Sequence, residues 1–291
     1  MTPSELARKV RYIQLHTRRA VNDLLAGEYI SAFKGTGMEF EEVREYQPGD
    51  DVKSIDWNVT AKQGRPYIKR FREERELTVI FAVDLSASGA FGSSELSKNE
   101  LSAELCAMLA LSAVKSNDKV GMAIFTDQLE KFIPPAKGSG NALRLVREIL
   151  AFSPKHRGTD ITGAIDYLGR ILRRRAVVFL ISDFQDSGYL EKLAAFSRKH
   201  DVIAITVADP DELSLPNVGL IELQDSETGK MLLVDTGSAA FRRRFAAAAR
   251  LQLDNLGSAF RAAGIDQIVL QTHQDYAQKL ITFFKTREHH H

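Results

Sequence analysis

Three polar side chains follow an apolar run in the stretch FAVDLSASGAFGSSE, which covers residues 81–95. Asp84, Ser86 and Ser88 occupy alternate positions there, and alternate side chains of an extended segment point the same way. One carboxylate and two hydroxyls can therefore share a centre. Oxygen ligands of this kind suit a hard divalent cation such as Mg²⁺ or Mn²⁺, and no thiolate or imidazole accompanies them to favour zinc.

Two other segments offer further oxygen ligands. Asp183 follows the apolar run VVFLIS, and Thr159 lies in KHRGTDITGAI, just before an expected helix. Ligands of open α/β sheets collect at the carboxyl ends of the parallel strands, so we expect these segments to converge with the first one. The predicted ligands of the cation are Asp84, Ser86, Ser88, Thr159 and Asp183.

Such a site predicts binding rather than catalysis. Three of the predicted ligands are neutral hydroxyls, so the cation would keep part of its positive charge. With one coordination position left open, the cation would attract a carboxylate of another molecule. We therefore expect a partner to be held through an acidic side chain, with no bond-breaking step.

Helix capping is the alternative role for several of these polar residues, because Ser, Thr and Asp are preferred at helix N-termini. Joint placement at the ends of strands favours the cation site over capping for the five predicted ligands. The expected caps are Ser94 or Ser97, Thr159 or Asp160, and Asp186 or Ser187.

Short apolar runs alternate with helical stretches over most of the chain. This alternation predicts an α/β fold, a mainly parallel sheet with helices on both sides. The expected strands cover residues 77–83, 119–125, 176–182, 201–207 and 265–271, and the expected helices about 97–116, 139–152, 160–174, 187–200 and 238–263. Residues 128–134 read as an antiparallel edge strand, and the apolar runs on either side of SETGK as a hairpin.

The part of the chain before the first strand has a different pattern. Residues 4–30 carry one apolar stripe at helical spacing, which predicts an amphipathic helix. From residue 35 to about 75, short extended runs are separated by turn sequences, and Pro48-Gly49 suits the centre of a type II turn. Trp57 is expected to be buried between this β-rich segment and the sheet.

Composition limits the classes of partner. The 39 basic and 38 acidic side chains leave a formal net charge of +1, so no overall field favours nucleic acid or an anionic membrane. No segment approaches the roughly 18–20 apolar residues of a membrane span, and no apolar run of a secretion signal opens the chain. Cys106 lies in an apolar pattern and is expected to pack in the core. We therefore expect a cytoplasmic protein.

The quoted motifs resemble a known site. DLSAS after the first strand, GTD before a helix and ISD after a later strand look like the metal-ion-dependent adhesion site (MIDAS) of von Willebrand factor A domains. The preceding segment, GTGMEFEEVREYQPGDDVKSIDWNVTAKQGRPYIKRFREERE, is similar to the signature of the DUF58 family, bacterial proteins with an A-domain-like core. Genes of that family often neighbour those of MoxR-type AAA+ ATPases.

The resemblance implies a set of roles and boundaries. Asp84, Ser86, Ser88, Thr159 and Asp183 would hold Mg²⁺, or Mn²⁺ or Ca²⁺, in a non-enzymatic module that works with a MoxR-type ATPase in chaperone-like or complex-assembly tasks. The implied divisions are an N-terminal helix (1–34), a β-rich signature segment packed on the core (35–76), a von Willebrand factor A-like domain (77–286) and a tail (287–291). The three histidines that end this tail are typical of a purification-tag remnant.

Two other functions remain alternatives. A Mg²⁺-dependent phosphate-ester hydrolase would use Asp84 as nucleophile or ligand, but the second carboxylate that such enzymes need two residues later is replaced by Ser86. Nucleic-acid binding would depend on short basic runs at residues 173–175 and 242–244 and on the basic segment 62–72. His156, His200 and His273 are expected to be surface residues rather than acid or base groups.

Overall fold

The structure is a computed structural model that describes residues 3–21, 29, 32–33, 39–72, 76–90, 92–93, 96–224 and 229–288. The chain forms two compact units. The smaller unit comprises Phe33–Glu76, and the larger one comprises Met1–Ala32 together with Leu77–His291.

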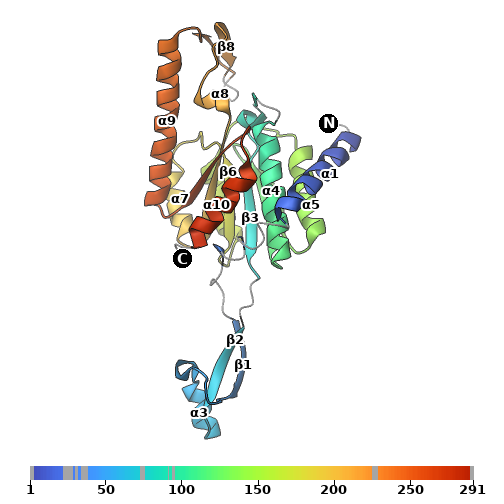
Figure 1. Cartoon of the computed structure of the whole chain (residues 1–291), viewed down its shortest axis with the longest axis vertical. Helices are drawn as coiled ribbons and strands as arrows, with labels where there is room; N and C mark the ends of the chain where they lie inside the picture. The colour runs from blue at the N-terminus through green and yellow to red at the C-terminus, as the bar shows by residue number, and fades with distance from the viewer. Residues whose placement is uncertain are drawn as a thin grey trace. The chain divides into compact units, whose positions relative to one another are not determined.

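A six-stranded sheet lies at the centre of the larger unit, in the order β10-β7-β6-β3-β4-β5 (Figure 1). All neighbouring strands pair in parallel except β5, which pairs antiparallel with β4 at one edge. The mainly parallel sheet and the antiparallel edge strand that the sequence predicts are thus confirmed. The strands are β3 (Thr78–Asp84), β4 (Lys119–Phe125), β5 (Leu129–Ala136), β6 (Val177–Ser182), β7 (Asp201–Ala208) and β10 (Asp266–Gln271).

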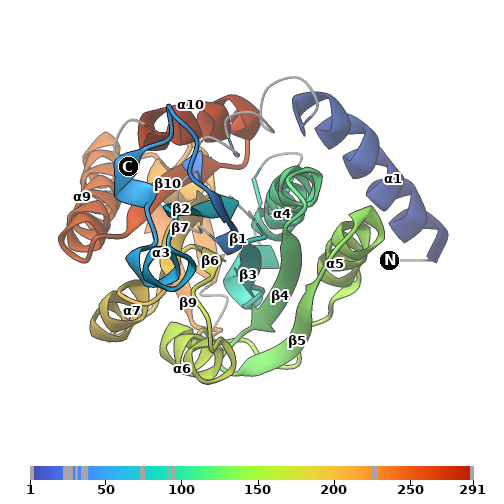
Figure 2. The same ribbon diagram turned by 90° about the horizontal axis from the view of Figure 1, so that it is seen from below.

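Helices cover both faces of this sheet (Figure 2). One face carries α4 (Lys98–Lys115), α5 (Ser139–Ala151) and α10 (Tyr276–Glu288), and the other carries α6 (Ile161–Ile171), α7 (Leu190–Ser197) and α9 (Ala239–Ala262). Helix α4 is buried nearly all round, as expected of a helix with neighbours on several sides. It packs between the sheet and α1 (Pro3–Ala20), and Cys106 is fully buried in it, as predicted.

The first part of the amphipathic helix predicted for residues 4–30 is confirmed. Helix α1 ends at Ala20 and buries Val10 and Ile13 on one face. Residues 22–28 lie outside the part of the chain that the structure describes. Within the described residues, no helix combines the length and the apolar character needed to cross a membrane.

The smaller unit is built on an antiparallel pair, β1 (Glu39–Glu45) and β2 (Tyr67–Arg72). Between these strands lie the 3₁₀ turn η2 (Val52–Ser54) and a helix that we did not predict, α3 (Trp57–Gln63). Asp56 caps this helix by accepting hydrogen bonds from the N–H groups of Asn58 and Val59, and Gly64 ends it in the left-handed conformation. These two capping residues were the sequence signals for α3.

Two further predictions concern the smaller unit. Gly49 has a φ of +109°, and Asp50 N–H donates to the carbonyl of Gln47 over 3.0 Å, as the predicted turn requires. Trp57, the first residue of α3, is 68% exposed and so is not a core residue of the smaller unit. The contact with the sheet that we predict for it would join the two units, and it stays a prediction.

The hairpin around SETGK is confirmed as β8 (Leu220–Gln224) and β9 (Met231–Asp235). Its strands pair with one another and form a separate sheet, near the short helix α8 (Pro210–Leu213) and the start of α9 (Figure 1). Leu220, Leu232 and Leu233 are each more than 60% exposed.

The last helix extends further than expected. Helix α10 runs to Glu288 and buries Arg287, which forms ion pairs with Asp201 and Asp266. The predicted start of the tail, at residue 287, is therefore too early in the sequence, because Arg287 belongs to the packed unit. The three terminal histidines lie outside the described residues.

His200 is buried rather than exposed, contrary to the prediction, whereas His273 is exposed as expected. The imidazole stacks at 4.4 Å on the ring of Phe196. Neither ring nitrogen has a hydrogen-bond partner among the described residues. Burial, together with the positive charges of Lys199 and Arg175, lowers the pKa of His200 to about 4.

This burial predicts a loss of stability in mild acid. The unfolded chain binds a proton at His200 with the ordinary pKa of 6.5, whereas the folded chain does so only near pH 4. The unfolded state therefore gains relative stability as the pH falls from 6.5 to 4, by roughly 3 kcal/mol for this one group. Urea unfolding across this range should show the loss in the wild type relative to His200→Phe.

His273→Phe is the matched control for this experiment, because the side chain of His273 is exposed. The wild type and this control should lose stability equally as the pH falls. Parallel pH profiles for the wild type and His200→Phe would show that His200 does not contribute to the acid sensitivity.

Candidate functional site

Two carboxylates meet at the carboxyl edge of the central sheet. Asp84 is the last residue of β3, and Asp183 directly follows β6. These strands are neighbours and run parallel, so both carboxylates emerge at the same edge. The chain turns after Asp84 into a 3₁₀ helix, η3 (Ala87–Ala90), that carries Ser88.

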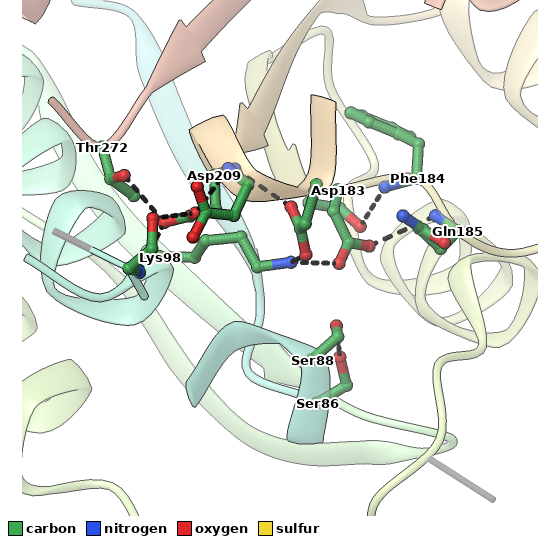
Figure 3. Close-up of polar contacts among 12 residues, drawn as sticks. Ser86, Ser88, Lys98, Asp183, Phe184, Gln185, Asp209 and Thr272 are labelled. Atoms are coloured by element: carbon green, nitrogen blue, oxygen red, sulfur yellow. Dashed lines mark hydrogen bonds and ion pairs between the residues drawn. The ribbon is translucent and has the colours of Figure 1, made fainter. Parts of the chain in front are cut away.

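A small cavity of about 10 Å³ lies between these segments, close to the space that one water molecule needs. Asp84, Ser86, Ser88 and Asp183 line it, so the structure brings four of the five predicted ligands together. The Oγ atoms of the two serines lie 3.1 Å apart, on the same side of their loop (Figure 3). The 3₁₀ turn η3 brings the serines together, rather than the extended loop that the alternate spacing predicts.

Asp84 is held firmly in this cavity. Its Oδ1 accepts a hydrogen bond from Ser86 N–H at 2.9 Å, and its Oδ2 accepts one from Ser182 Oγ at 2.6 Å. Burial and the nearby charge of Asp183 raise the pKa of Asp84 to about 6, although the hydrogen bonds from Ser182 and Ser86 oppose the shift. Two carboxylates close together in a buried place are a charge arrangement that a cation would relieve.

Thr159, the fifth predicted ligand, lies in the adjoining loop and does not line the cavity. The loop is tied to the site by its main chain, because Ala87 N–H donates to the carbonyl of Arg157 over 3.0 Å. Asp160 caps α6, as predicted for Thr159 or Asp160. Asp186 also serves this helix by accepting a hydrogen bond from Ile161 N–H at 2.9 Å. The N-cap of α7 is Tyr189, with no side-chain hydrogen bond, so the prediction of Asp186 or Ser187 as its cap is wrong.

Lys98 is a member of the site that the sequence analysis missed. It is the first residue of α4, it is only 2% exposed, and it lines the same cavity. Its Nζ donates to Asp183 Oδ2 at 2.8 Å and to Glu212 Oε1 at 2.7 Å (Figure 3). Burial alone lowers the pKa of Lys98, but the two carboxylates outweigh burial and raise the pKa, so the side chain is an ammonium ion.

The sequence held one signal for this role. A lysine at the first position of a helix opposes the helix dipole, so it needs compensation by nearby negative charge. Ser97 caps α4 as predicted, in a capping box with Glu100, and this box determines where the helix starts. The helix start in turn directs Lys98 to the cavity.

Asn99 supplies another oxygen atom to the cavity wall. Its Oδ1 is buried without a hydrogen-bond partner among the described residues. The amide group lies directly over Gly89, where an added Cβ would collide with it. An acceptor that is buried and unsatisfied is costly unless a ligand or water completes it.

The residues therefore fit a hard cation by the chemistry of their oxygen atoms. In the described part of the chain, no three His, Cys, Asp or Glu side chains gather so as to hold a metal ion. A cation here would thus depend on Asp84 and Asp183 together with hydroxyl oxygens. It would also share Asp183 with the ammonium group of Lys98.

A larger cavity of about 410 Å³ adjoins the site, and it too was not predicted. Asp183 lines both cavities, and Glu212 and Tyr189 line the larger one. Phe184, which follows Asp183, has a φ of +58° and is buried against Phe260. A bulky residue with positive φ is rare, so the packing of Phe184 determines the direction in which the chain leaves Asp183.

The chain is similar in sequence to a protein family and to several known proteins. The family model described as "Protein of unknown function DUF58" matches residues 42–255. An uncharacterized protein of Mycobacterium tuberculosis (strain ATCC 25618 / H37Rv) is 31% identical over 288 residues, 97% of this chain and 90% of that protein. An uncharacterized protein of Mycobacterium avium is 34% identical over 160 residues, 53% of this chain and 93% of that protein.

Two solved structures are also similar. The conserved hypothetical protein BatB from Bacteroides thetaiotaomicron has 19% identity and a TM-score of 0.45, with 72% of this chain and 98% of that chain covered. An aerotolerance-related membrane protein from Bacteroides fragilis NCTC 9343 has 18% identity and a TM-score of 0.48, with 74% and 100% covered.

Proposed function

This chain belongs to the DUF58 family of proteins of unknown function, and we propose that it is an interaction module that uses a divalent cation to bind an acidic side chain of a protein partner. The observation that carries the proposal is the convergence of Asp84, Ser86, Ser88 and Asp183 on one small cavity. The proposal includes a von Willebrand factor A-like fold with a MIDAS-type site, which the strand-end position of these ligands supports.

Each residue has a defined part in this proposal. Asp84 and Asp183 would supply the negative charge, and Ser86 and Ser88 would supply neutral oxygen atoms. Ser182 orients Asp84 by donating a hydrogen bond to its Oδ2 over 2.6 Å, as groups behind a metal ligand commonly do. Mg²⁺, or Mn²⁺ or Ca²⁺, would supply a positive charge and a coordination position for an incoming carboxylate.

The identity of the partner depends on the family resemblance alone. We propose a MoxR-type AAA+ ATPase, or its client, in chaperone-like or complex-assembly tasks in the cytoplasm. The proposed role involves no turnover. A phosphate-ester hydrolase would instead show Mg²⁺-dependent release of phosphate that is lost in Asp84→Asn.

Asp84→Ala is expected to weaken Mn²⁺ binding by more than about 100-fold, because loss of residues that only orient a metal ligand already costs 10–100-fold. Isothermal titration of the whole chain would measure the affinity. Asp127→Ala is the matched control, since Asp127 is exposed and follows the neighbouring strand β4 without lining the cavity. Equal affinities in the wild type and Asp84→Ala would show that this cavity does not bind the ion.

The partner is tested with a MoxR-type ATPase purified from the same host. Its affinity for this chain should fall when a chelator replaces Mg²⁺, and Asp84→Ala should bind as weakly as the chelated wild type. Binding that is unchanged by the chelator and by the substitution would contradict a metal-dependent contact.

A further inference from the structure

We propose that Lys98 is a built-in cation of the cavity, which competes with a divalent ion for Asp183 and so sets the affinity of the site. The inference rests on the proposed function, because it assigns a role to Lys98 in the same site. Nothing in the spacing of the five predicted ligands indicates such a competitor.

The position of Lys98 carries the inference. The ammonium group lies 2.8 Å from Asp183 Oδ2, the carboxylate oxygen of a predicted ligand. Lys98 shares the cavity wall with Asp84 and the two serines, and in Figure 3 its side chain reaches across to Asp183 above Ser86 and Ser88. A cation that binds Asp183 must therefore share this carboxylate with Lys98 or displace it.

The burial of Lys98 prevents it from simply moving into solvent. Its side chain is only 3% exposed, and lysine is almost never fully buried unless it is paired. Its charge is fixed by the pairs with Asp183 and Glu212. A divalent ion entering the cavity would meet this positive charge at close range, where repulsion is little screened by water.

Glu212 offers the ammonium group a second partner. Its Oε1 accepts from Lys98, while its Oε2 accepts from Asp209 N–H at 3.0 Å in the capping box of α8. Asp209 is itself fully buried and accepts a hydrogen bond from Thr272 Oγ1 at 3.0 Å (Figure 3). Glu212 is thus held in place, so Lys98 keeps one partner when an ion takes Asp183.

The test measures Mn²⁺ affinity by isothermal titration of the wild type, Lys98→Met and Lys98→Gln. Both variants remove the charge, and the glutamine amide can still donate hydrogen bonds to the two carboxylates if the methionine variant folds poorly. We expect both to bind Mn²⁺ at least about tenfold more tightly than the wild type, because the competing charge is gone. Adding Asp84→Ala to either variant should abolish this binding.

Lys131→Met makes the same chemical change at the partly exposed ion pair with Glu148, away from the cavity, and should leave the affinity unchanged. Equal affinities in the wild type and both Lys98 variants would overturn the role of Lys98 and leave the proposed ion site standing. Binding by the Lys98 variants without binding by the wild type would support the role of Lys98 and overturn ion use by the native chain. Absence of binding in every protein would overturn both.

Discussion

Replacing Gly121 by alanine is expected to lower the free energy of unfolding by about 2–3 kcal/mol. Gly121 lies in the middle of β4, beside the edge strand β5. A Cβ at this position would lie 2.8 Å from Pro135 N and 2.9 Å from the carbonyl oxygen of Ile133. Both are main-chain atoms, so the clash requires the edge strand itself to shift.

The local pairing explains why the backbones approach so closely. The register between β4 and β5 shifts between Val120 and Met122, where the edge strand bulges. Proline suits such a bulge because it cannot donate to the ladder, and Pro134 and Pro135 occupy it. Gly121 is the residue that leaves room for the prolines.

Urea unfolding of Gly121→Ala and Gly140→Ala would test this prediction. Gly140 lies in the first turn of α5, and an added Cβ meets nothing within 4 Å. Gly140→Ala should be neutral or stabilising by up to about 1 kcal/mol. Equal stability of the two variants would show that β5 accommodates a side chain at position 121.

Replacing Arg287 by leucine should destabilise the larger unit by about 3–5 kcal/mol, the usual cost of removing one partner of a buried ion pair. The side chain of Arg287 is 5% exposed, and its partner Asp201 is 14% exposed. Arg287 Nε also lies 3.3 Å from Asp266 Oδ2. Without Arg287, the carboxylate of Asp201 would lose this ion-pair partner in a place that water barely reaches.

Thermal unfolding of Arg287→Leu, Arg287→Lys and Lys285→Leu would measure this loss. Arg287→Lys should recover part of the stability, because it keeps the charge but not the planar group that contacts two carboxylates. Lys285 is exposed in the same helical turn, so its replacement should change the stability by no more than about 0.5 kcal/mol. Comparable losses in Arg287→Leu and Lys285→Leu would contradict an ion-pair origin.

The candidate site was largely predictable because its carboxylates follow strands. Asp84 and Asp183 lie 99 positions apart in the sequence, yet each ends a strand of the same parallel sheet. Parallel strands that are neighbours bring their carboxyl ends together without further information. Thr159 was less predictable, because it lies in a loop whose course depends on main-chain contacts such as that between Ala87 and Arg157.

Local sequence patterns were enough to predict the type and order of most elements of the larger unit. Buried strands read as short runs of β-branched and apolar residues, helices read as longer periodic stretches, and capping residues such as Ser97 mark where a helix starts. These signals are local, since each depends on residues within one or two turns or along one strand. The turn at Gly49 was predictable for the same reason.

Contacts between distant segments determine which charged and aromatic side chains are buried. Lys98 meets Asp183 and Glu212 from 85 and 114 positions away, and Arg287 meets Asp201 from 86 positions away. His200 was predicted wrongly because the burial of such a residue depends on neighbours from distant segments. A lysine with bulk water around it and a lysine between two buried carboxylates have the same local sequence pattern, and long-range packing alone distinguishes them.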